Sequence, residues 1–382
     1  MYKKKFRLIN FEPYENTIIN FLDDLSKNIR LEFKDKISKD IFYLIFWLSK
    51  KNILKFKKKY KVLKLKNRIG RGKLVHFAAQ NIPTNFVYSL AFGLLSGNSN
   101  VIIYPDKIIE ARKIILTINK LLNFKKYNTL KSSNYFIKSS SFSYSSKIIQ
   151  NPDARIIWGG DKKVNSIRKY FLTDSRCVDL IFGDRYSISL FDFSKISKNK
   201  SSLDKIIKNF YLDNYLFNQN ACSSSHIIYW KNDRSNYKEL FWKKLAEYSK
   251  SVFSLNLSQS VRKYKKINSY LLKHKFRKVK YYNRNLTVIE LGKNYEPELL
   301  RGESGIFFEK NINSLQQVNL DVTNKLQTLS IIGFNKSMIV NWIKKENLNG
   351  IDRIVDVGSC LQMDLVWDGY DVVGTLSRII NA

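Results

Sequence analysis

Between residues 72 and 183, short apolar runs alternate with segments of helical periodicity, and this alternation constrains the fold more than any other feature. Each apolar run has the length of a buried strand and is followed within four residues by Gly or Pro. The predicted strands are 73–79, 100–104, 154–158 and 178–182, and the predicted helices are 84–96, 107–122 and 162–170. Such a rhythm is typical of an α/β fold, in which helices cover an open parallel sheet.

The chain is too long for one hydrophobic core. It has 382 residues, of which 44% are hydrophobic, so we expect two domains, each with its own core. We predict a helical N-terminal segment over 1–60, a first α/β domain over 61–215 and a second α/β domain over 216–382. Two finer expectations are a strand over 61–65 and a helix over 201–217.

The net charge is strongly positive. It amounts to +35, from 67 Lys and Arg against 32 Asp and Glu, and such a charge attracts polyanions, including nucleic acid. However, the lysines occur with abundant Asn, Ile, Tyr, Phe and Ser, the set that an AT-rich genome favours, and their clusters are scattered along the chain. We therefore expect solvated surface and no specific nucleic-acid partner, although a phosphorylated ligand would benefit from the same charge.

The three cysteines, Cys177, Cys222 and Cys360, are spaced neither as a zinc ribbon nor as a redox pair. We expect no metal site, since the three histidines and the dispersed carboxylates also lack ligand spacing. A reducing cytoplasm is the simplest location for such a chain. The first residues lack the pattern of a signal peptide, and the apolar stretch 41–48 is too short to span a bilayer.

No G-x-G-x-x-G or Walker-type loop occurs, which weakens the case for an ordinary Rossmann dehydrogenase. Six other short motifs follow one another in a characteristic order: HFAAQNIP, FGLLSGNSNVIIYP, IIWGGDKKV, FGDRYS, NQNACSSS and WDGYD. In this order the chain resembles the LuxC-like acyl-CoA reductases of bacterial bioluminescence, which belong to the aldehyde dehydrogenase superfamily. The resemblance covers residues 68–382. It implies an aldehyde dehydrogenase-like fold with a dinucleotide-binding domain followed by a catalytic domain.

The resemblance implies that Cys222 is the nucleophile. Most cysteines are buried structural thiols, and the residues alone favour that alternative. The resemblance also implies that Asn81 supplies a side-chain amide to the oxyanion hole. The second donor would be the backbone N–H of Cys222. Asn81 is equally compatible with a simple turn before Ile82-Pro83. His226 lies four residues after Cys222, but we interpret it as a structural histidine within a predicted strand, 226–230.

The resemblance also implies a nicotinamide dinucleotide, NADPH in the first place and NADH as the alternative. Gly159 and Gly160 lie between a strand and a helix, where their backbone could approach a pyrophosphate. The remaining cofactor candidates are Gly97, Asn98, Tyr104, Pro105 and Gly183. Relatives often carry a basic residue at the end of the strand 101–104, but this strand has none, which leaves the choice between NADPH and NADH open.

Aldehyde-oxidising relatives carry a glutamate that activates water, and Ile181 occupies that place here. The resemblance therefore implies reduction of an acyl thioester, by way of an acyl-cysteine, and the missing glutamate favours this direction over aldehyde oxidation.

The substrate that the resemblance implies is a fatty acyl-CoA or acyl-protein, and the implied partner is an acyl-activating LuxE-like ligase. A homo-oligomer is compatible with the resemblance. The alternatives are aldehyde oxidation by the same cysteine and a non-catalytic basic scaffold that binds nucleic acid. Gln327-Thr328 and Trp367-Asp368-Gly369 match further short motifs of the family.

Overall fold

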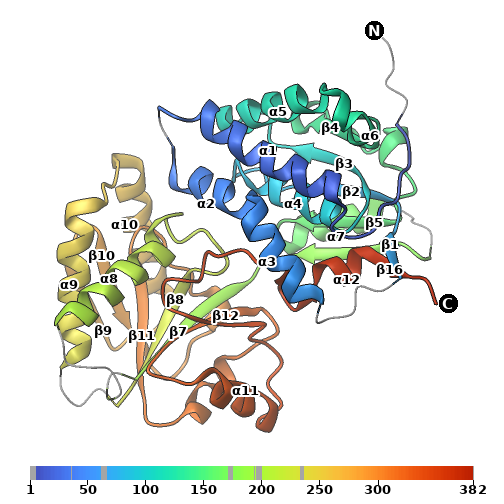
Figure 1. Ribbon diagram of the computed structural model, residues 1–382. Coiled ribbons are helices and arrows are strands. Elements are labelled where there is room, and N and C mark those ends of the chain that lie inside the picture. The colour runs from blue at the N-terminus through green and yellow to red at the C-terminus, as the bar shows by residue number, and fades with distance from the viewer. Residues whose placement is uncertain are drawn as a thin grey trace. The chain divides into compact units, whose positions relative to one another are not determined.

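The computed structural model describes residues 6–35, 37–61, 67–170, 175–192, 194, 200–232 and 236–381 (Figure 1). Within these residues, the apolar runs of the first half form a five-stranded sheet in the order β4-β3-β2-β5-β6. All of its neighbouring strands are parallel. The strands are β2 (Lys73–Phe77), β3 (Ser99–Tyr104), β4 (Asn134–Lys138), β5 (Ala154–Trp158) and β6 (Val178–Phe182). The predicted α/β fold with an open parallel sheet is confirmed.

The order of this sheet reverses once. β3 and β4, which follow β2 in the chain, lie on one side of it. The next two strands, β5 and β6, lie on its other side. In open α/β sheets, ligands bind outside the carboxyl ends of the strands at such a reversal. The reversal lies between β2 and β5, which end at Phe77 and Trp158.

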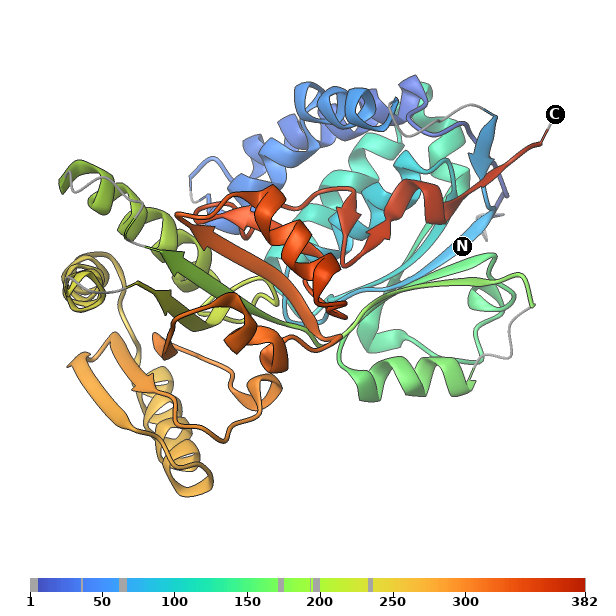
Figure 2. The same ribbon diagram turned by 90° about the horizontal axis from the view of Figure 1, so that it is seen from below.

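Helices cover both faces of the five-stranded sheet. The apolar side chains of α4 and α5 belong to one hydrophobic cluster, whereas Val164 and Ile167 of α7 belong to another cluster on the opposite face. Figure 2 shows α7 across the sheet from the N-terminal helices. The covering helices are α4 (Asn85–Leu95), α5 (Ile109–Leu122), α6 (Asn128–Ser133) and α7 (Asp161–Tyr170), with short 3-10 turns η1 (Lys125–Tyr127), η2 (Ser139–Ser141) and η3 (Lys147–Ile149).

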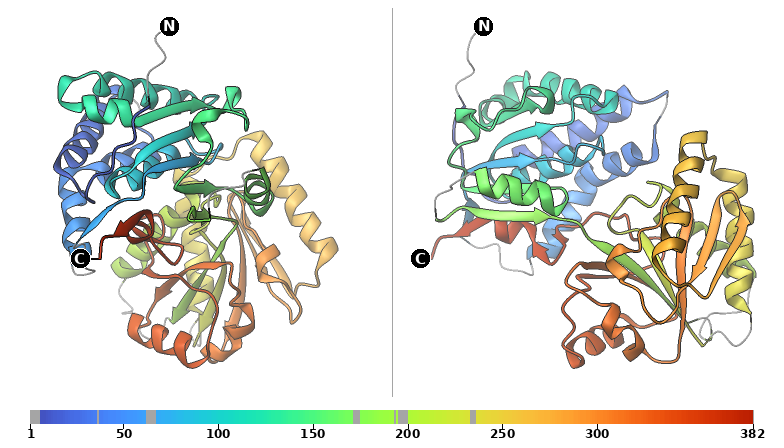
Figure 3. Two further views of the ribbon diagram at one scale, coloured as in Figure 1. Left: turned by 90° about the vertical axis from the view of Figure 1, so that its right-hand side faces the viewer. Right: turned by 180° about the vertical axis from the view of Figure 1, so that it is seen from behind.

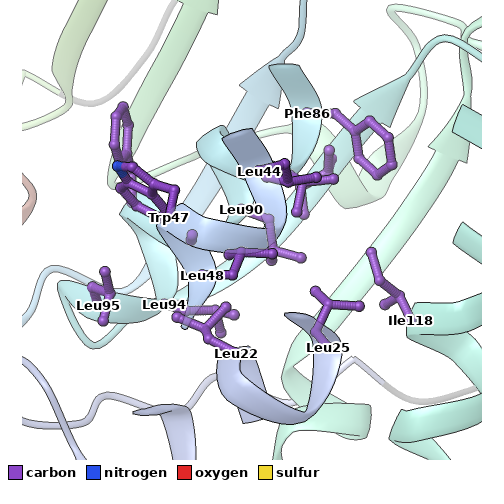
Figure 4. Close-up of a cluster of buried hydrophobic side chains, with 14 of the residues drawn as sticks. Leu22, Leu25, Leu44, Trp47, Leu48, Phe86, Leu90, Leu94, Leu95 and Ile118 are labelled. Carbon is purple, nitrogen blue, oxygen red and sulfur yellow. The ribbon is translucent and has the colours of Figure 1, made fainter. Parts of the chain in front are cut away.

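The N-terminal segment is an integral layer of this α/β unit. It forms α1 (Asn16–Glu32), α2 (Lys39–Leu48) and α3 (Lys50–Lys61). Leucines of α1 and α2 interdigitate with those of α4 in one buried cluster (Figure 4). Fully burying each such side chain contributes roughly 1.5–3 kcal/mol, so the segment adds substantially to the core. The strand that we predicted over 61–65 falls mostly on 62–66, which lie outside the described residues.

The C-terminal residues return to the same unit. β16 (Ser377–Ile379) pairs antiparallel with β1 (Arg68–Gly70), and α12 (Val372–Leu376) contributes to the same core. The family motif at 367–371 is a hairpin of β14 (Val366–Trp367) and β15 (Tyr370–Asp371). Asp368 and Gly369 both have positive φ, 50° and 77°, which explains the Asp-Gly pair because a tight two-residue hairpin requires it.

A second sheet has seven strands in the order β13-β12-β7-β8-β11-β10-β9. Only the pairing of β9 with β10 is antiparallel. α8 and α9 pack on one face, and α10 and α11 on the other (Figure 3). The elements are β7 (Tyr186–Asp192), α8 (Lys200–Tyr215), β8 (Ser225–Lys231), α9 (Tyr237–Val252), α10 (Leu257–Lys273), β9 (Lys278–Asn283), β10 (Leu286–Glu290), η5 (Pro297–Leu299), β11 (Ile306–Ile312), η6 (Leu315–Asp321), β12 (Leu326–Ile332), α11 (Lys336–Lys345) and β13 (Arg353–Asp356).

The chain divides differently from our prediction. Unit 1 comprises Met1–Gly183 and Met363–Ala382, and unit 2 comprises Asp184–Gln362. The sequence predicts the transition at 215–216, before the strand that follows Cys222. The structure moves it to 183–184, because β7 pairs with β8 and β12 and so belongs to the second sheet. Residues 1–60, expected to stand apart, belong to unit 1. No helix within the described residues is both long and apolar enough to cross a membrane.

Candidate active site

Cys222 lies in unit 2, on the loop that joins α8 to β8, and is partly exposed. This position agrees with the predicted helix and strand on either side of it. Before it, Asn218 and Gln219 adopt left-handed backbone conformations, with φ of 52° and 60°. Such conformations are costly for residues that carry a Cβ, so surrounding contacts must hold the loop in place.

Gln219 provides two of these contacts. Its side chain is only 2% exposed. Its Oε1 accepts a hydrogen bond from the backbone N–H of Gly305 at 2.8 Å, and its Nε2 donates to the carbonyl oxygen of Ile306 at 3.0 Å. These two backbone groups lie where β11 begins. One side chain therefore attaches the loop before Cys222 to the amino end of a central strand.

Hydrogen bonds from β7 and α8 hold the rest of the loop. Ser187 Oγ donates to the carbonyl oxygen of Cys222 at 2.6 Å. Two residues further on, Ser224 Oγ donates to the Asp213 carbonyl oxygen at 2.7 Å, and the Ser225 N–H donates to Asn214 Oδ1 at 2.7 Å. Ser224 and Ser225 are buried, and their hydrogen bonds anchor the loop to α8. They fix the backbone of Cys222 while the residue itself keeps partial access to solvent.

His226 has a structural role in this arrangement. Its Nδ1 accepts a hydrogen bond from the Gly302 N–H at 2.9 Å, and the residue is 4% exposed. Burial, with the positive charges of Arg301 and Lys266, lowers the pKa of His226 to about 3, so the ring is neutral near pH 7. With Nδ1 occupied by a backbone donor, the ring orders the 302–306 loop that also binds Gln219.

Cys360 does not offer a second nucleophile. It is fully buried, and burial together with Asp213 raises the pKa of its thiol well above the usual value. It therefore remains a protonated thiol near pH 7. Cys177 is partly exposed, like Cys222, but lies just before β6 in unit 1. No group of three or more His, Cys, Asp or Glu in the described residues could hold a metal ion.

In unit 1, several cofactor candidates meet at the carboxyl edge of the sheet. Tyr104 is the last residue of β3, and Pro105 follows it. Gly159 and Gly160 follow β5, and Gly183 follows β6. The register aligns these ends across the sheet, because Ile103 pairs with Phe77, Phe77 with Ile157 and Ile157 with Ile181. The Gly159 N–H donates to the Phe182 carbonyl oxygen at 3.1 Å. These candidates thus share one edge, at the strand reversal.

The two adjacent glycines have different surroundings. Gly159 has φ of +151°, and a Cβ on it would lie 2.7 Å from Cδ of Lys163. A Cβ on Gly160 would meet nothing within 4 Å, so this glycine borders open space. Lys163 itself reaches back over Gly159, and its Nζ donates to the carbonyl oxygens of Ala78 and Trp158, both at 2.9 Å. Burial lowers the pKa of Lys163 to about 8.

Tyr104 and Pro105 are both buried, and the Tyr104 ring packs on Phe86 at a centroid distance of 5.8 Å. The next residue, Asp106, accepts hydrogen bonds from Ser139 Oγ and from the N–H of Ser140, which tie the ends of β3 and β4 together. At the far end of the edge, a Cβ on Gly183 would find Asp161 Oδ1 at 3.7 Å. A side chain at residue 183 would therefore be in van der Waals contact with Asp161, at the start of α7.

Gly97 and Asn98 lie elsewhere. They precede β3 and so stand at the amino edge of the sheet, opposite the carboxyl edge. Gly97 has φ of +84°, and a Cβ on it would lie 2.1 Å from the Phe11 carbonyl oxygen. Asn98 is 1% exposed, accepts from the Gly72 N–H at 3.1 Å and donates to the Leu376 carbonyl oxygen at 2.9 Å. The backbone N–H groups of both residues close α4, and the Asn98 side chain bonds to the end of α12. The structure does not bring these two residues to the other candidates.

Asn81 lies on the loop between β2 and α4, beyond the carboxyl end of β2, and is exposed. Its side-chain amide makes no hydrogen bond to another described residue. The turn that could have required it is held instead by Asn85, whose Oδ1 accepts from the Ala79 N–H at 2.9 Å. The Asn81 amide is therefore accessible to a ligand at this edge.

Comparison with known proteins identifies the family. The sequence matches the acyl-CoA reductase (LuxC) family over residues 3–380. The chain belongs to the LuxC acyl-CoA reductase family. No curated protein matches it.

Solved structures of the aldehyde dehydrogenase type share the fold of this LuxC family member. An oxidoreductase from Marinobacter aquaeolei has a TM-score of 0.67 at 11% identity, covering 98% of this chain and 87% of that one. Aldehyde dehydrogenase 21 from Physcomitrella patens has a TM-score of 0.65 at 9% identity, covering 95% and 85%. A bifunctional proline utilization A protein has a TM-score of 0.64 at 11% identity, and the match covers 95% of this chain but 40% of that one. The predicted aldehyde dehydrogenase-like fold is confirmed.

In each unit of this LuxC family member, the candidate region contains residues that sequence reasoning missed. Gln219 and Ser187 hold the Cys222 loop, and Lys163 occupies the strand reversal. Gln219 had a weak signal, since it directly precedes Asn220-Ala221-Cys222 within a family motif. Lys163 had none that separated it from the other cationic residues of so basic a chain, because only the folded unit shows where its ammonium lies.

Proposed function

We propose that this chain reduces an acyl thioester, acyl-CoA or acyl-protein, to an aldehyde with a nicotinamide dinucleotide as hydride donor, through an acyl-cysteine at Cys222. One observation carries the proposal: in a member of the acyl-CoA reductase family, Cys222 is partly exposed on a loop whose backbone is anchored on both sides. A nucleophile held in a fixed position loses little entropy when it attacks.

The first half of the cycle is acyl transfer. The Cys222 thiolate attacks the thioester carbonyl, the bond from carbon to the leaving sulfur breaks, and the departing thiolate takes up a proton. The acyl group is then a thioester of Cys222. Negative charge develops on the carbonyl oxygen during this attack, and we assign the Asn81 amide and the Cys222 backbone N–H as its donors. This assignment is supported by the exposed amide of Asn81, which makes no hydrogen bond to another described residue.

The second half of the cycle is reduction and release. When bound, the reduced nicotinamide supplies a hydride to the acyl carbon. The resulting oxyanion is held by the same two donors. It collapses, the bond from carbon to the Cys222 sulfur breaks, and the aldehyde leaves while the thiolate re-forms.

The carboxyl edge of unit 1 fits a dinucleotide. Gly160 borders open space, Gly159 and Gly183 complete the edge, and Tyr104 with Pro105 closes its other end. We expect NADPH to be preferred over NADH, because the strongly basic chain favours the ligand with the additional phosphate. Gly97 and Asn98 are left out of this proposal, since their buried contacts lie at the other edge.

Ile181 supports reduction over aldehyde oxidation. Its side chain is half-buried among the apolar residues that pack between α7 and the sheet, with its Cγ2 4.0 Å from an ideal Cβ on Gly183. An alkyl group at this place cannot activate water against the acyl-cysteine. The family suggests a fatty acyl chain, an acyl-activating ligase that delivers it, and a homo-oligomer as further expectations. We also expect a cytoplasmic location, because none of the three cysteines, all of which are described, forms a disulfide.

A direct assay tests the function. Fatty acyl-CoAs of several chain lengths are incubated with NADPH or NADH, the nicotinamide absorbance is followed, and aldehyde and free acid are both quantified. We expect dinucleotide oxidation with one aldehyde formed per dinucleotide. Faster oxidation of aldehyde with NADP⁺ or NAD⁺ to free acid would support the alternative direction, and no turnover in either direction would contradict the proposal.

A further inference from the structure

Lys163 occupies the point where the strand order of unit 1 reverses. Its ammonium bridges the carbonyl oxygen of Ala78, directly after β2, and that of Trp158, the last residue of β5, at 2.9 Å each. These are the two strands between which the order changes. These two hydrogen bonds account for the direction of the Lys163 side chain. One residue thus joins the two strand ends that border the expected ligand crevice.

Within the part of the chain that the structure describes, the ammonium of Lys163 has no carboxylate partner. Among the described residues, no carboxylate oxygen lies within 4.0 Å of its Nζ. Its neighbours Asp161 and Lys162 are exposed, and the strand ends that face it present Phe77, Ala78 and Trp158. A partly buried cation bonded only to neutral carbonyls is costly unless an anion joins it.

The remaining donor of Lys163 is available to such an anion. An ammonium group has three N–H donors, and the two carbonyl oxygens use two of them. The stem of the side chain reaches this place because residue 159 is glycine, since a Cβ there would lie 2.7 Å from Lys163 Cδ. Gly159 therefore makes room for the lysine stem, whereas Gly160 is the glycine that leaves open space.

We propose that Lys163 is an anion-binding residue of the dinucleotide site, which directs its third N–H to a phosphate of the bound cofactor. This inference rests on the proposed function, because it takes the dinucleotide as the ligand of this edge. It assigns a task to a residue outside the candidates that the sequence indicated. The phosphate belongs either to the pyrophosphate, which NADH and NADPH share, or to the additional phosphate of NADPH.

The test compares Lys163→Met with Lys162→Met. The two substitutions remove the same charge from adjacent residues of α7, but Lys162 is exposed. Dissociation constants are measured for NADPH, NADH and the uncharged probe adenosine, by calorimetry and by the fluorescence of the bound reduced nicotinamide. We expect Lys163→Met to weaken dinucleotide binding by roughly tenfold to a hundredfold, the range for losing one hydrogen bond to a charged group. Lys162→Met and adenosine binding should change by less than about threefold.

The two dinucleotides locate the phosphate. Equal losses for NADH and NADPH place Lys163 at the pyrophosphate, and a loss confined to NADPH places it at the additional phosphate. Unchanged affinity for both in a folded Lys163→Met protein overturns the inference but leaves the proposed function intact. A wild-type protein that binds neither dinucleotide overturns both.

A pH titration of the wild type keeps the inference testable if the variant does not fold. Burial lowers the pKa of Lys163 to about 8, so the ammonium loses its proton as the pH rises through that value. Affinity for the dinucleotide should therefore fall between about pH 7 and about pH 9.5, in Lys162→Met as in the wild type. A dissociation constant that stays constant over this range overturns the inference.

Discussion

The attachment of the Cys222 loop by Gln219 leads to a quantitative prediction. Gln219→Met keeps the size of this buried side chain but removes both of its hydrogen bonds, to the Gly305 N–H and to the Ile306 carbonyl oxygen. The two backbone groups would be left without these bonds in a buried environment. Each buried group that loses its partner costs about 1–3 kcal/mol, so for the two groups we expect the free energy of unfolding to fall by about 2–6 kcal/mol.

The loss should also appear in the chemistry. Without Gln219, the left-handed conformation at 218–219 loses its support, so the backbone of Cys222 gains freedom. We expect acyl transfer to slow by about tenfold or more, because a small displacement of a nucleophile is costly. Dinucleotide affinity should change by less than about twofold, since the proposed edge lies in unit 1.

The assay for Gln219 combines urea unfolding with a single-turnover measurement of CoA release. Asn220→Ala, an exposed position on the same loop, is the matched control and should behave as the wild type. A folded Gln219→Met protein with wild-type stability and an unchanged rate of CoA release would refute the reasoning that this side chain positions the nucleophile.

Three further predictions follow. Asn81→Ala should lower turnover by about a hundredfold if its amide stabilises the oxyanion, with stability unchanged because the residue is exposed; an unaltered rate would leave Asn81 a turn residue. Ile181→Glu should increase the share of free acid over aldehyde, and Ile181→Gln should not, because only the carboxylate can activate water; equal product ratios in the two folded variants would contradict this role of the site. Both Ile181 variants need a stability measurement, since the position is half-buried among apolar residues. Burial lowers the pKa of His76 to about 4, below its unfolded value, so the unfolded state binds more protons between pH 6.5 and about 4, and stability should fall as the pH drops through this range. Urea unfolding at several pH values should show that the free energy of unfolding depends less on pH in His76→Gln than in the wild type. The same pH dependence in both proteins would show that His76 does not become charged on unfolding.

Much of the fold follows from periodicity. The parallel sheet, the helices α4, α5, α7 and α8, and the loop that carries Cys222 lie within a few residues of their predicted places. These elements are set by local patterns, apolar alternation and Gly or Pro at their ends. The division into units was misplaced because strand pairing between β7 and β12 joins residues far apart in sequence, and no local pattern reports such a pairing.

The site was predictable only in part for the same reason. Gly97 and Asn98 match a family motif and were candidates on that ground alone, but the motif does not report that their contacts with Gly72 and Leu376 are made at the amino edge of the sheet. Lys163 stands out only through its two carbonyl partners, and one of them, Ala78, lies 85 positions earlier in the chain. Contacts of this range depend on the assembled sheet.

The central claim is that Cys222 carries the acyl group, and the mass of the acylated protein tests it most directly. The wild type is mixed with a fatty acyl-CoA in the absence of dinucleotide, and the modified residue is located by peptide mass spectrometry. We expect one acyl group, on Cys222, which leaves as aldehyde when NADPH is added. Cys222→Ser should fold and bind NADPH but carry no acyl group, because a serine hydroxyl is scarcely ionised. An acyl group on Cys177 instead, or aldehyde formation by Cys222→Ser at the wild-type rate, would contradict the account.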